Sequence, residues 1–325
     1  MKAVCLTKDR FLRRVLKRTL KAAGIICVCV DSAAEVTDLA LQKPELIIVD
    51  HGTVALLQLD NLIDTIDWET KVLVMSDWEN RAESFDILKS NRCNNILSRE
   101  HPVEEDDIVI TTGKILRGDI FGLEKYVTWG TIIKEKQIST YDEKRIAIRD
   151  VARFAKCVGC RRQMIDRVEI VVDELLMNAL YDAPATRFGK NRKELVARAT
   201  PGSGPICDQP ATLRYACDGR YLVVSVMDGF GELRKNSILE NMSNDEYDEK
   251  SGLRKPGPEG GLGLFYIMSY VSRFIANIQP KKATEVICLF DLRRSRKETP
   301  RHATSFNIFL ANSREQDDEL KTRSV

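Results

Sequence analysis

One helical segment constrains this chain more than any other feature of its sequence. Residues 166–182 carry Glu174 and Asn178 four positions apart, so both side chains fall on one helix face. Apolar residues surround this pair on most sides: Val171, Val172, Leu175, Leu176, Met177, Ala179 and Leu180. A helix this apolar is buried, and a buried carboxylate and amide need polar partners. A metal ion and a phosphate chain would supply them; the alternative is a pair on the solvent side.

Two glycine-bearing segments follow this helix. The first, Asp228-Gly-Phe-Gly231, ends a strand-like run that begins at Tyr221. The second, Gly260-Gly261-Leu262-Gly263-Leu264, opens an apolar helix. Backbone amides at a glycine-rich helix start form a cradle for phosphate. A glycine cluster alone would be weak evidence, but its position after an Asp-Gly turn and an Asn-bearing helix strengthens the prediction.

In order and spacing, these three segments resemble the N, G1 and G2 boxes of the GHKL ATPases. The resemblance implies an α/β sandwich of the Bergerat type that binds ATP and Mg²⁺. Asn178 would ligate the magnesium ion, and Glu174 would act as the catalytic residue that orients or deprotonates the attacking group. Asp182 would lie near the adenine or ribose.

The same resemblance implies roles for residues of the two glycine-bearing segments. Asp228 would accept a hydrogen bond from the adenine amino group, and Gly229 and Gly231 would let the backbone turn beside the base. The phosphates would lie against Gly260, Gly261, Leu262, Gly263 and Leu264. Phe230 and Glu232 depart from the usual Asp-x-Gly-x-Gly pattern, which puts the packing of adenine in question.

Residues 1–118 alternate strand-like and helix-like runs, which predicts a doubly wound parallel sheet with helices on both faces. Here Pro44–Asp50 resembles the third strand of response-regulator receiver domains, a flavodoxin-like fold. Asp50 would occupy the phospho-acceptor position, Ser76 the switch position, and Arg99 the place of the phosphate-binding lysine.

The departure from receivers lies after the first strand, where an acidic pair normally holds magnesium. Thr7 and Lys8 stand there, followed only by Asp9. Aspartyl phosphorylation needs the charge of the metal ion, so we expect a pseudo-receiver that is not phosphorylated. Lys8 could replace the metal ion, or simply pair with Asp50.

The patterns along the whole chain predict the domain boundaries. We expect a receiver-like domain over 1–118, a linker helix over 119–130, an ATP-binding domain over 131–311 and a polar tail over 312–325. The polar stretch 232–259 is expected to be a lid loop. The three histidines are His51, His101 and His302, and none lies on the helix just before the ATPase segment, which argues against a histidine kinase of the usual arrangement.

The composition of the chain indicates the cellular environment and the classes of partner to expect. No apolar run approaches the roughly 18 residues of a membrane span, and the start lacks a signal-peptide pattern, so we expect no membrane partner and a cytoplasmic protein. Nine cysteines, several in apolar strands, fit buried free thiols. Cys157-Val-Gly-Cys160 is expected to be a pair of helix-end thiols. A formal charge of +2 does not indicate nucleic acid.

Among GHKL proteins the chain most resembles the anti-sigma-factor serine kinases. The first hypothesis is therefore a signalling protein in which a receiver-like domain regulates a domain that binds ATP and Mg²⁺, acting as a Ser/Thr kinase on a partner protein. The alternative is an ATP-gated adaptor without turnover. A weaker alternative is a DNA-binding regulator that uses the basic first helix. A homodimer is compatible with each.

Overall fold

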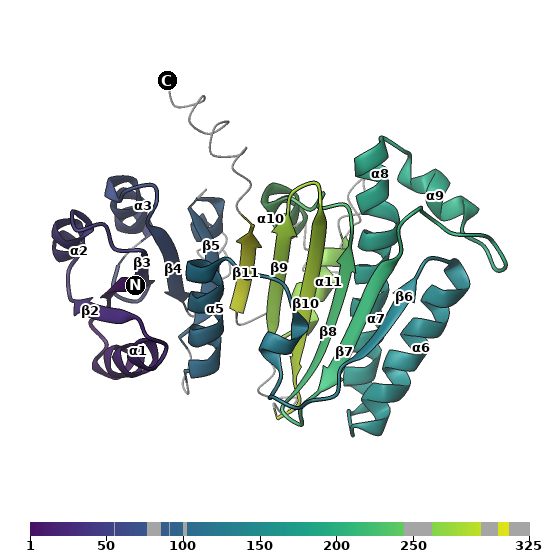
Figure 1. Ribbon diagram of the computed structural model, residues 1–325, viewed down its shortest axis with the longest axis horizontal. Helices are drawn as coiled ribbons and strands as arrows, with labels where there is room; N and C mark the ends of the chain where they lie inside the picture. Colours follow the sequence, from purple (N-terminus) through teal and green to yellow (C-terminus); the bar gives the residue numbers. More distant parts are fainter. Residues whose placement is uncertain are drawn as a thin grey trace, which may run out of the picture. The chain divides into compact units, whose positions relative to one another are not determined.

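The computed structural model describes residues 1–54, 56–76, 86–90, 92–99, 103–243, 262–293 and 305–311. The chain divides into two compact units (Figure 1). The first contains Met1–Ile120 and Thr304–Phe309, and the second contains Phe121–Ala303 and Leu310–Val325. Both are α/β, which confirms the predicted fold class.

The first unit alternates strands and helices along the chain. Its elements are β1 (Lys2–Leu6), α1 (Arg10–Ala22), β2 (Ile26–Val30), α2 (Ala33–Ala40), β3 (Leu46–Asp50), α3 (Leu56–Thr65), β4 (Lys71–Ser76), β5 (Cys93–Ser98), α5 (Glu105–Arg117) and β11 (Ser305–Leu310).

The sheet of this unit has the order β2-β1-β3-β4-β5, with every neighbouring pair parallel. This is the flavodoxin-like order, so the first unit has the receiver-like fold that the sequence predicts. All five residues of β3 are buried, because helices cover both faces of the sheet. On one face, the apolar sides of α1 and α5 pack against the strands through residues that include Leu12, Leu16 and Ile108.

The strand β11 departs from the expected domain boundary. We assigned 131–311 to the second domain, but Thr304–Phe309 belong to the first unit. β11 pairs antiparallel with β5, where Phe306 lies opposite Ile96 and Asn307 opposite Asn95. Ser305 donates a hydrogen bond of 2.8 Å to the buried Asp107 on α5. The edge strand of the first unit is thus supplied by the far end of the sequence.

The second unit combines an antiparallel sheet with a layer of helices. Its elements are η1 (Leu123–Tyr126), β6 (Lys134–Ile138), α6 (Tyr141–Cys157), α7 (Arg162–Met177), η2 (Asn178–Asp182), α8 (Ala183–Phe188), α9 (Arg192–Arg198), β7 (Ala211–Cys217), β8 (Tyr221–Asp228), α10 (Lys235–Ser243), α11 (Leu262–Tyr270), β9 (Arg273–Gln279) and β10 (Ala283–Asp291). The strand order is β9-β10-β8-β7-β6, and neighbouring strands are antiparallel.

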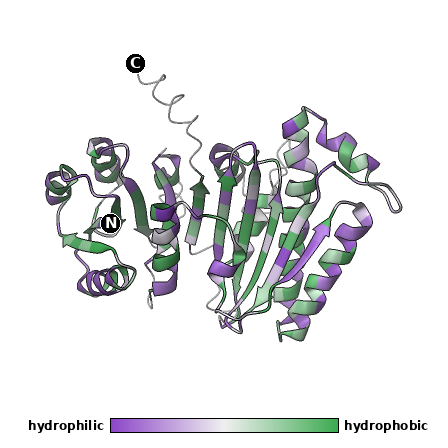
Figure 2. Cartoon of the chain, viewed as in Figure 1, coloured by the Kyte–Doolittle hydropathy of each residue, from purple (hydrophilic) through white to green (hydrophobic). Residues whose placement is uncertain are grey.

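The two faces of this sheet are covered differently. α7 packs between α6 and α11 over one face (Figure 1). The strands β8, β9 and β10 are mostly apolar, whereas β6 is hydrophilic (Figure 2). The opposite face carries Glu285, which is buried and accepts hydrogen bonds from Asn277 and from the backbone of Gly122.

That last contact corrects the predicted linker helix. Of residues 119–130, only Leu123–Tyr126 are helical, as one 3₁₀ turn. Gly122 has φ +112, a backbone conformation that ends any regular helix before it. Leu123 and Tyr126 are buried, and Glu124 pairs with Arg214 of β7. Leu123 and Tyr126 therefore pack on the sheet of the second unit, whereas Trp129 is exposed. Within the described ranges, no helix is long and apolar enough to cross a membrane.

Candidate functional site

A cavity of about 490 Å³ in the second unit brings together the three segments singled out in the sequence. Its walls come from α7 and η2, from the end of β8, and from the start of α11. The expected site residues in its lining are Glu174, Asn178, Asp182, Asp228, Gly263 and Leu264. Val226, Ile267, Phe274 and Val286 add apolar wall. Polar and charged side chains make up about half of the lining, including Glu232, Arg234, Ser237 and Glu240 from the segment after β8. The result is a concave site that combines apolar wall with many convergent polar groups.

The helix that carries the acidic group and the amide is not a regular α-helix throughout. α7 ends at Met177, and Asn178–Asp182 form a π-helical turn before α8. Pro184 follows directly and cannot donate a hydrogen bond to the carbonyl four residues earlier, which favours a widened turn. Both Asn178 and Asp182 line the cavity from this turn. Turns of this kind occur often at functional sites.

Glu174 lies against the start of α11. A methyl group on Gly263 would overlap the Glu174 carboxylate, so the absence of a side chain at Gly263 makes room for that group. Burial raises the pKa of Glu174, and the neighbouring Asp173 raises it further. A carboxyl group with a raised pKa suits a general base or a position beside a bound cation.

Asp228 ends β8 at the bottom of the cavity and is 8% exposed. Its Oδ1 accepts hydrogen bonds from the backbone amides of Phe230, at 2.8 Å, and Gly231, at 3.2 Å. Burial nevertheless raises the pKa of Asp228 to about 6. Thr284 stands directly opposite on β10, and its buried Oγ1 has no hydrogen-bond partner in the described part of the chain. Asp228 also has a backbone hydrogen bond with Thr284, yet its pKa stays raised, and the Thr284 hydroxyl has no partner among the described residues.

Gly229 and Gly231 lie outside the lining of the cavity. Gly231 has φ +66 and touches the backbone of the β9–β10 turn, where Lys281 donates a hydrogen bond of 3.1 Å to its carbonyl. A methyl group on Gly229 would overlap the side chain of Gln209. The close approach that requires glycine here is thus made by the protein itself. The contact of both residues with a base stays a prediction.

Cationic side chains at the rim balance part of the acidic charge. Arg192 forms an ion pair with Asp182, and Arg187 lies 3.2 Å from Glu232. Burial raises the pKa of Asp182 in spite of Arg192, which acts in the opposite direction. Sequence reasoning missed Arg192 and Thr284. A polar residue inside the apolar run 283–290 was the available signal for Thr284.

The donor set fits the expected ligand. Mg²⁺ prefers oxygen ligands, and the Asn178 amide stands one helical turn from the Glu174 carboxylate. Asp228 and the unpartnered Thr284 hydroxyl offer an acceptor and a donor to a polar ring edge. Leu262 begins α11, while Gly260 and Gly261 lie outside the described residues. The expected lid loop is partly helical, because α10 buries Ile238 and Leu239; 244–259 also lie outside.

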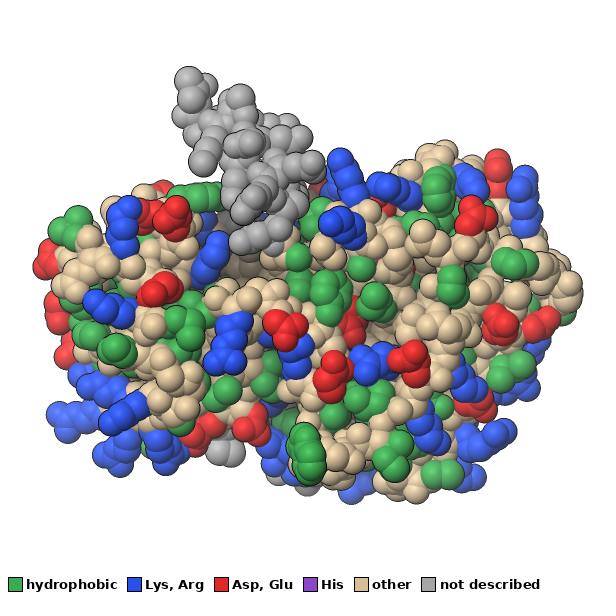
Figure 3. All heavy atoms as spheres, viewed as in Figure 1, with side chains coloured by type: hydrophobic (Ala, Val, Ile, Leu, Met, Phe, Trp, Pro, Cys, Tyr) green, Lys and Arg blue, Asp and Glu red, His purple; other side chains and the backbone are tan. Residues whose placement is uncertain are grey.

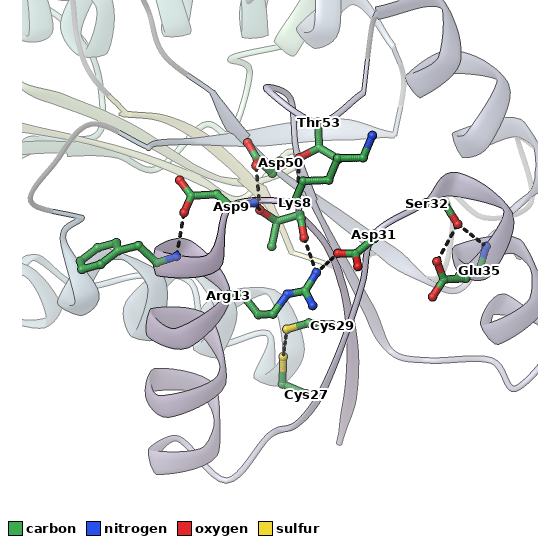
Figure 4. Close-up of polar contacts among 12 residues, drawn as sticks. Lys8, Asp9, Arg13, Cys27, Cys29, Asp31, Ser32, Glu35, Asp50 and Thr53 are labelled. Carbon is green, nitrogen blue, oxygen red and sulfur yellow. Dashed lines mark hydrogen bonds and ion pairs between the residues drawn. The ribbon is translucent and has the colours of Figure 1, made fainter.

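The expected receiver-like site is also assembled, in the first unit. Asp50 is 2% exposed at the end of β3. Its Oδ2 accepts hydrogen bonds from Thr7, at 2.8 Å, and from Thr53, at 3.0 Å (Figure 4). Its Oδ1 accepts one from the backbone of Gly52. Arg99 lies 3.3 Å from Asp50 and 3.7 Å from Asp9.

The position of Arg99 decides whether Arg99 or Lys8 is the cation beside Asp50. Its guanidinium lies where a methyl group on Gly52 would be, directly over the Asp50 carboxylate. Lys8 is exposed and points away from Asp50 past Thr53 (Figure 4). The cation beside Asp50 is thus Arg99, and the suggested Lys8 pairing is wrong. Ser76 is buried at the end of β4, and Asp9 caps α1 through Phe11 and Leu12.

Comparisons with known proteins found structural likeness only. No protein-family model and no curated protein sequence matches the chain. The receiver domain of nitrogen regulatory protein C is 20% identical over 36% of this chain and 94% of its own, with a TM-score of 0.31. A response regulator receiver protein from Burkholderia phymatum is 17% identical with the same coverage and TM-score. The SiaB-SiaC complex from Pseudomonas aeruginosa is 16% identical over 49% of this chain and 88% of its own, with a TM-score of 0.33.

Proposed function

We propose that the second unit binds an adenine nucleotide with Mg²⁺ in the cavity between α7, β8 and α11. One observation carries the proposal: Asn178, Asp228 and Gly263 stand far apart in the sequence and line a single hollow of about 490 Å³. That volume suits a small organic ligand. Its two ends also differ, because Asp228 lies among apolar strands while Glu174 and Asn178 face the start of α11.

The proposal gives each residue a role. Asp228 accepts a hydrogen bond from the adenine amino group, and Thr284 bonds to the same edge of the base. Asn178 ligates the metal ion, which would neutralise phosphate charge when bound. Glu174 orients or deprotonates the attacking water or hydroxyl. Backbone amides at the start of α11, near Gly263 and Leu264, hold the phosphates.

Calorimetry tests the binding step. The full chain is titrated with ATP, ADP, a non-hydrolysable ATP analogue and GTP, each with and without Mg²⁺. We expect adenine nucleotides to bind, GTP to bind at least tenfold more weakly, and Asn178→Ala to remove the effect of Mg²⁺. The matched control is Asn191→Ala, which changes an amide of the same unit outside the cavity lining. Binding that is equal for ATP and GTP would contradict the role of Asp228.

We propose further that this nucleotide site serves signalling, with a second signalling protein as partner in the cytoplasm. Transfer of labelled phosphate from ATP to a Ser or Thr of the partner, lost in Glu174→Gln, would identify a protein kinase. A partner complex that depends on nucleotide but not on Glu174 would identify an adaptor. The half-buried Glu174 with its raised pKa favours the kinase, since an adaptor has no need of a base there.

In this proposal the first unit regulates without being phosphorylated. The guanidinium of Arg99 already neutralises Asp50, and hydroxyls from Thr7 and Thr53 occupy its Oδ2. Incubation with Mg²⁺ and a small-molecule phosphodonor should leave the intact mass of the chain unchanged. A gain of one phosphoryl group that Asp50→Ala abolishes would show an active receiver instead.

A further inference from the structure

Three thiols meet in the first unit, away from both sites described above. Cys5 lies on β1, and Cys27 and Cys29 lie on the neighbouring strand β2. The Cys5 and Cys27 sulfur atoms are 3.2 Å apart, and those of Cys27 and Cys29 are 3.6 Å apart. All three sulfurs lie within 4.8 Å of one another, and all nine cysteines of the chain are free.

The strand register explains why these sulfurs converge. Cys5 pairs with Cys29 across the parallel β1–β2 ladder, and Cys27 and Cys29 share one face of β2 because side chains alternate along a strand. That face packs under α1 in the hydrophobic core of the unit. Cys5 is fully buried, while Cys27 and Cys29 are half-buried on the sheet edge. An incoming ion could thus reach the cluster from the edge, and a dry wall lies behind it.

The distances between the three sulfur atoms are close to those that one bound metal ion requires. Sulfur ligands at about 2.3 Å from a metal ion lie roughly 3.8 to 4.0 Å from one another in tetrahedral or trigonal geometry. The two closest separations, 3.2 and 3.6 Å, fall below this range, and all three sulfurs lie within 4.8 Å of one another, so side-chain rotations that move the sulfurs by less than an ångström would suffice. Among the described residues, no His, Asp or Glu joins the cluster as a fourth ligand. Zinc in structural sites takes four protein ligands, one more than this cluster offers, and copper(I) is another ion that thiolate ligands select.

We propose that Cys5, Cys27 and Cys29 form a three-coordinate thiolate site for a soft monovalent metal ion of the copper(I) class. Each thiol gives up its proton as a metal–sulfur bond forms, so binding releases protons to solvent. No change of oxidation state is involved.

Positive charge stands beside the cluster, and a thiolate site carries negative charge. Lys17 and Arg13, both on α1, are close enough to Cys29 to interact with it electrostatically. Arg13 lies beside Cys29 and is itself paired with Asp31 (Figure 4). Lys17 belongs to an exposed basic face of α1, and Lys and Arg gather over this helix in Figure 3: Arg10, Arg14, Lys17, Arg18 and Lys21.

The test uses the full chain, reduced and free of oxygen, with copper(I) supplied through a competing chelator. We expect one copper(I) ion per chain, an X-ray absorption spectrum with three sulfur neighbours, and a rise in the melting temperature of the first unit. Cys27→Ser and Cys29→Ser should each weaken binding by more than about 100-fold. Both residues are half-buried, so these variants should fold, and far-ultraviolet circular dichroism checks that they do.

The matched control is the double variant Cys157→Ser with Cys160→Ser, which removes two thiols of the second unit and should leave copper(I) affinity unchanged. Three results would overturn the proposal. One is equal copper(I) affinity in Cys27→Ser, Cys29→Ser and the unmodified chain. Another is tighter retention of zinc(II) than of copper(I) against matched chelators. The third is a spectrum with a fourth, non-sulfur neighbour.

Discussion

Asp50 in the first unit and Asp228 in the second are both buried carboxylates at the end of a strand, yet their surroundings differ. Asp50 accepts hydrogen bonds from Thr7, Thr53 and the Gly52 backbone and lies beside the guanidinium of Arg99. Asp228 accepts hydrogen bonds from the backbone amides of Phe230, Gly231 and Thr284. It has the acidic Glu232 as a charged neighbour, and its pKa is raised to about 6. The chain thus neutralises one carboxylate by itself and leaves the other insufficiently compensated. An insufficiently compensated carboxylate, such as that of Asp228, suits the binding of a ligand. A neutralised carboxylate, such as that of Asp50, suits a structural role.

The largest effect expected from this comparison concerns nucleotide affinity. Asp228→Ala should weaken ATP binding by about 2 to 3 kcal/mol, because a charged acceptor of the adenine amino group is lost. That corresponds to roughly 30- to 150-fold in the dissociation constant, measured by calorimetry. Asp50→Ala, the matched change in the other unit, should leave the constant unaltered. If both variants lose affinity equally, the two carboxylates do not differ in the way described.

The same pair of residues should respond with opposite signs when stability is measured. Asp228 has a folded-state pKa of about 6 against a usual 3.8, so the folded chain binds more protons between these values. The unfolding free energy of this unit therefore falls as pH rises from about 4 to 6. Asp228→Asn should raise it at pH 7 by up to about 3 kcal/mol and make little difference below pH 4.

Asp50→Asn should instead lower the unfolding free energy of the first unit by about 2 kcal/mol, since the partner charge of Arg99 is lost. Amide hydrogen exchange in β8 and in β3 would report the two units separately, because unfolding of a two-unit chain need not be two-state. A loss of stability in Asp228→Asn at pH 7 would show that its carboxylate is already well compensated.

Two glycines that lie within helices, Gly263 and Gly113, allow tests with smaller expected effects. A methyl group on Gly263 would overlap the Glu174 carboxylate, so Gly263→Ala should move that group and lower ATP turnover by about tenfold, or roughly 1.4 kcal/mol. ATP affinity should change much less, because Glu174 acts on the attacking group. Steady-state phosphate release checks the first effect and calorimetry the second. Unchanged turnover would remove Glu174 from the catalytic role.

The smallest effect belongs to Gly113, in the middle of α5, where an added methyl group meets nothing within 4 Å. Gly113→Ala should raise the unfolding free energy of the first unit by about 0.5 to 1 kcal/mol, because alanine loses less backbone freedom in a helix. Thermal melting measures it, and turnover should not move. A destabilised variant would contradict the open space around this position.

Particular elements show how much of the secondary structure could be predicted from local sequence patterns. The runs that became β3 and β8 were predicted to within one or two residues, since burial on a regular period shows in the residue order. The helix expected over 119–130 was wrong, because Gly122 has φ +112 and only Leu123–Tyr126 form a 3₁₀ turn. The π-helical turn at Asn178 was missed, although Pro184 was a signal for it.

By itself the residue order determined which side chains are polar within apolar runs, and hence that Glu174, Asn178, Asp228 and Asp50 need partners. It also determined the alternation that yields a parallel sheet in residues 1–118. Only the tertiary structure decided which partners they receive: Arg99 at Asp50, the unpartnered Thr284 at Asp228, and three thiols meeting across β1 and β2. The physical reason is that burial is recorded in local hydrophobic periodicity, whereas pairing depends on strand register and on backbone approaches between segments distant in the chain.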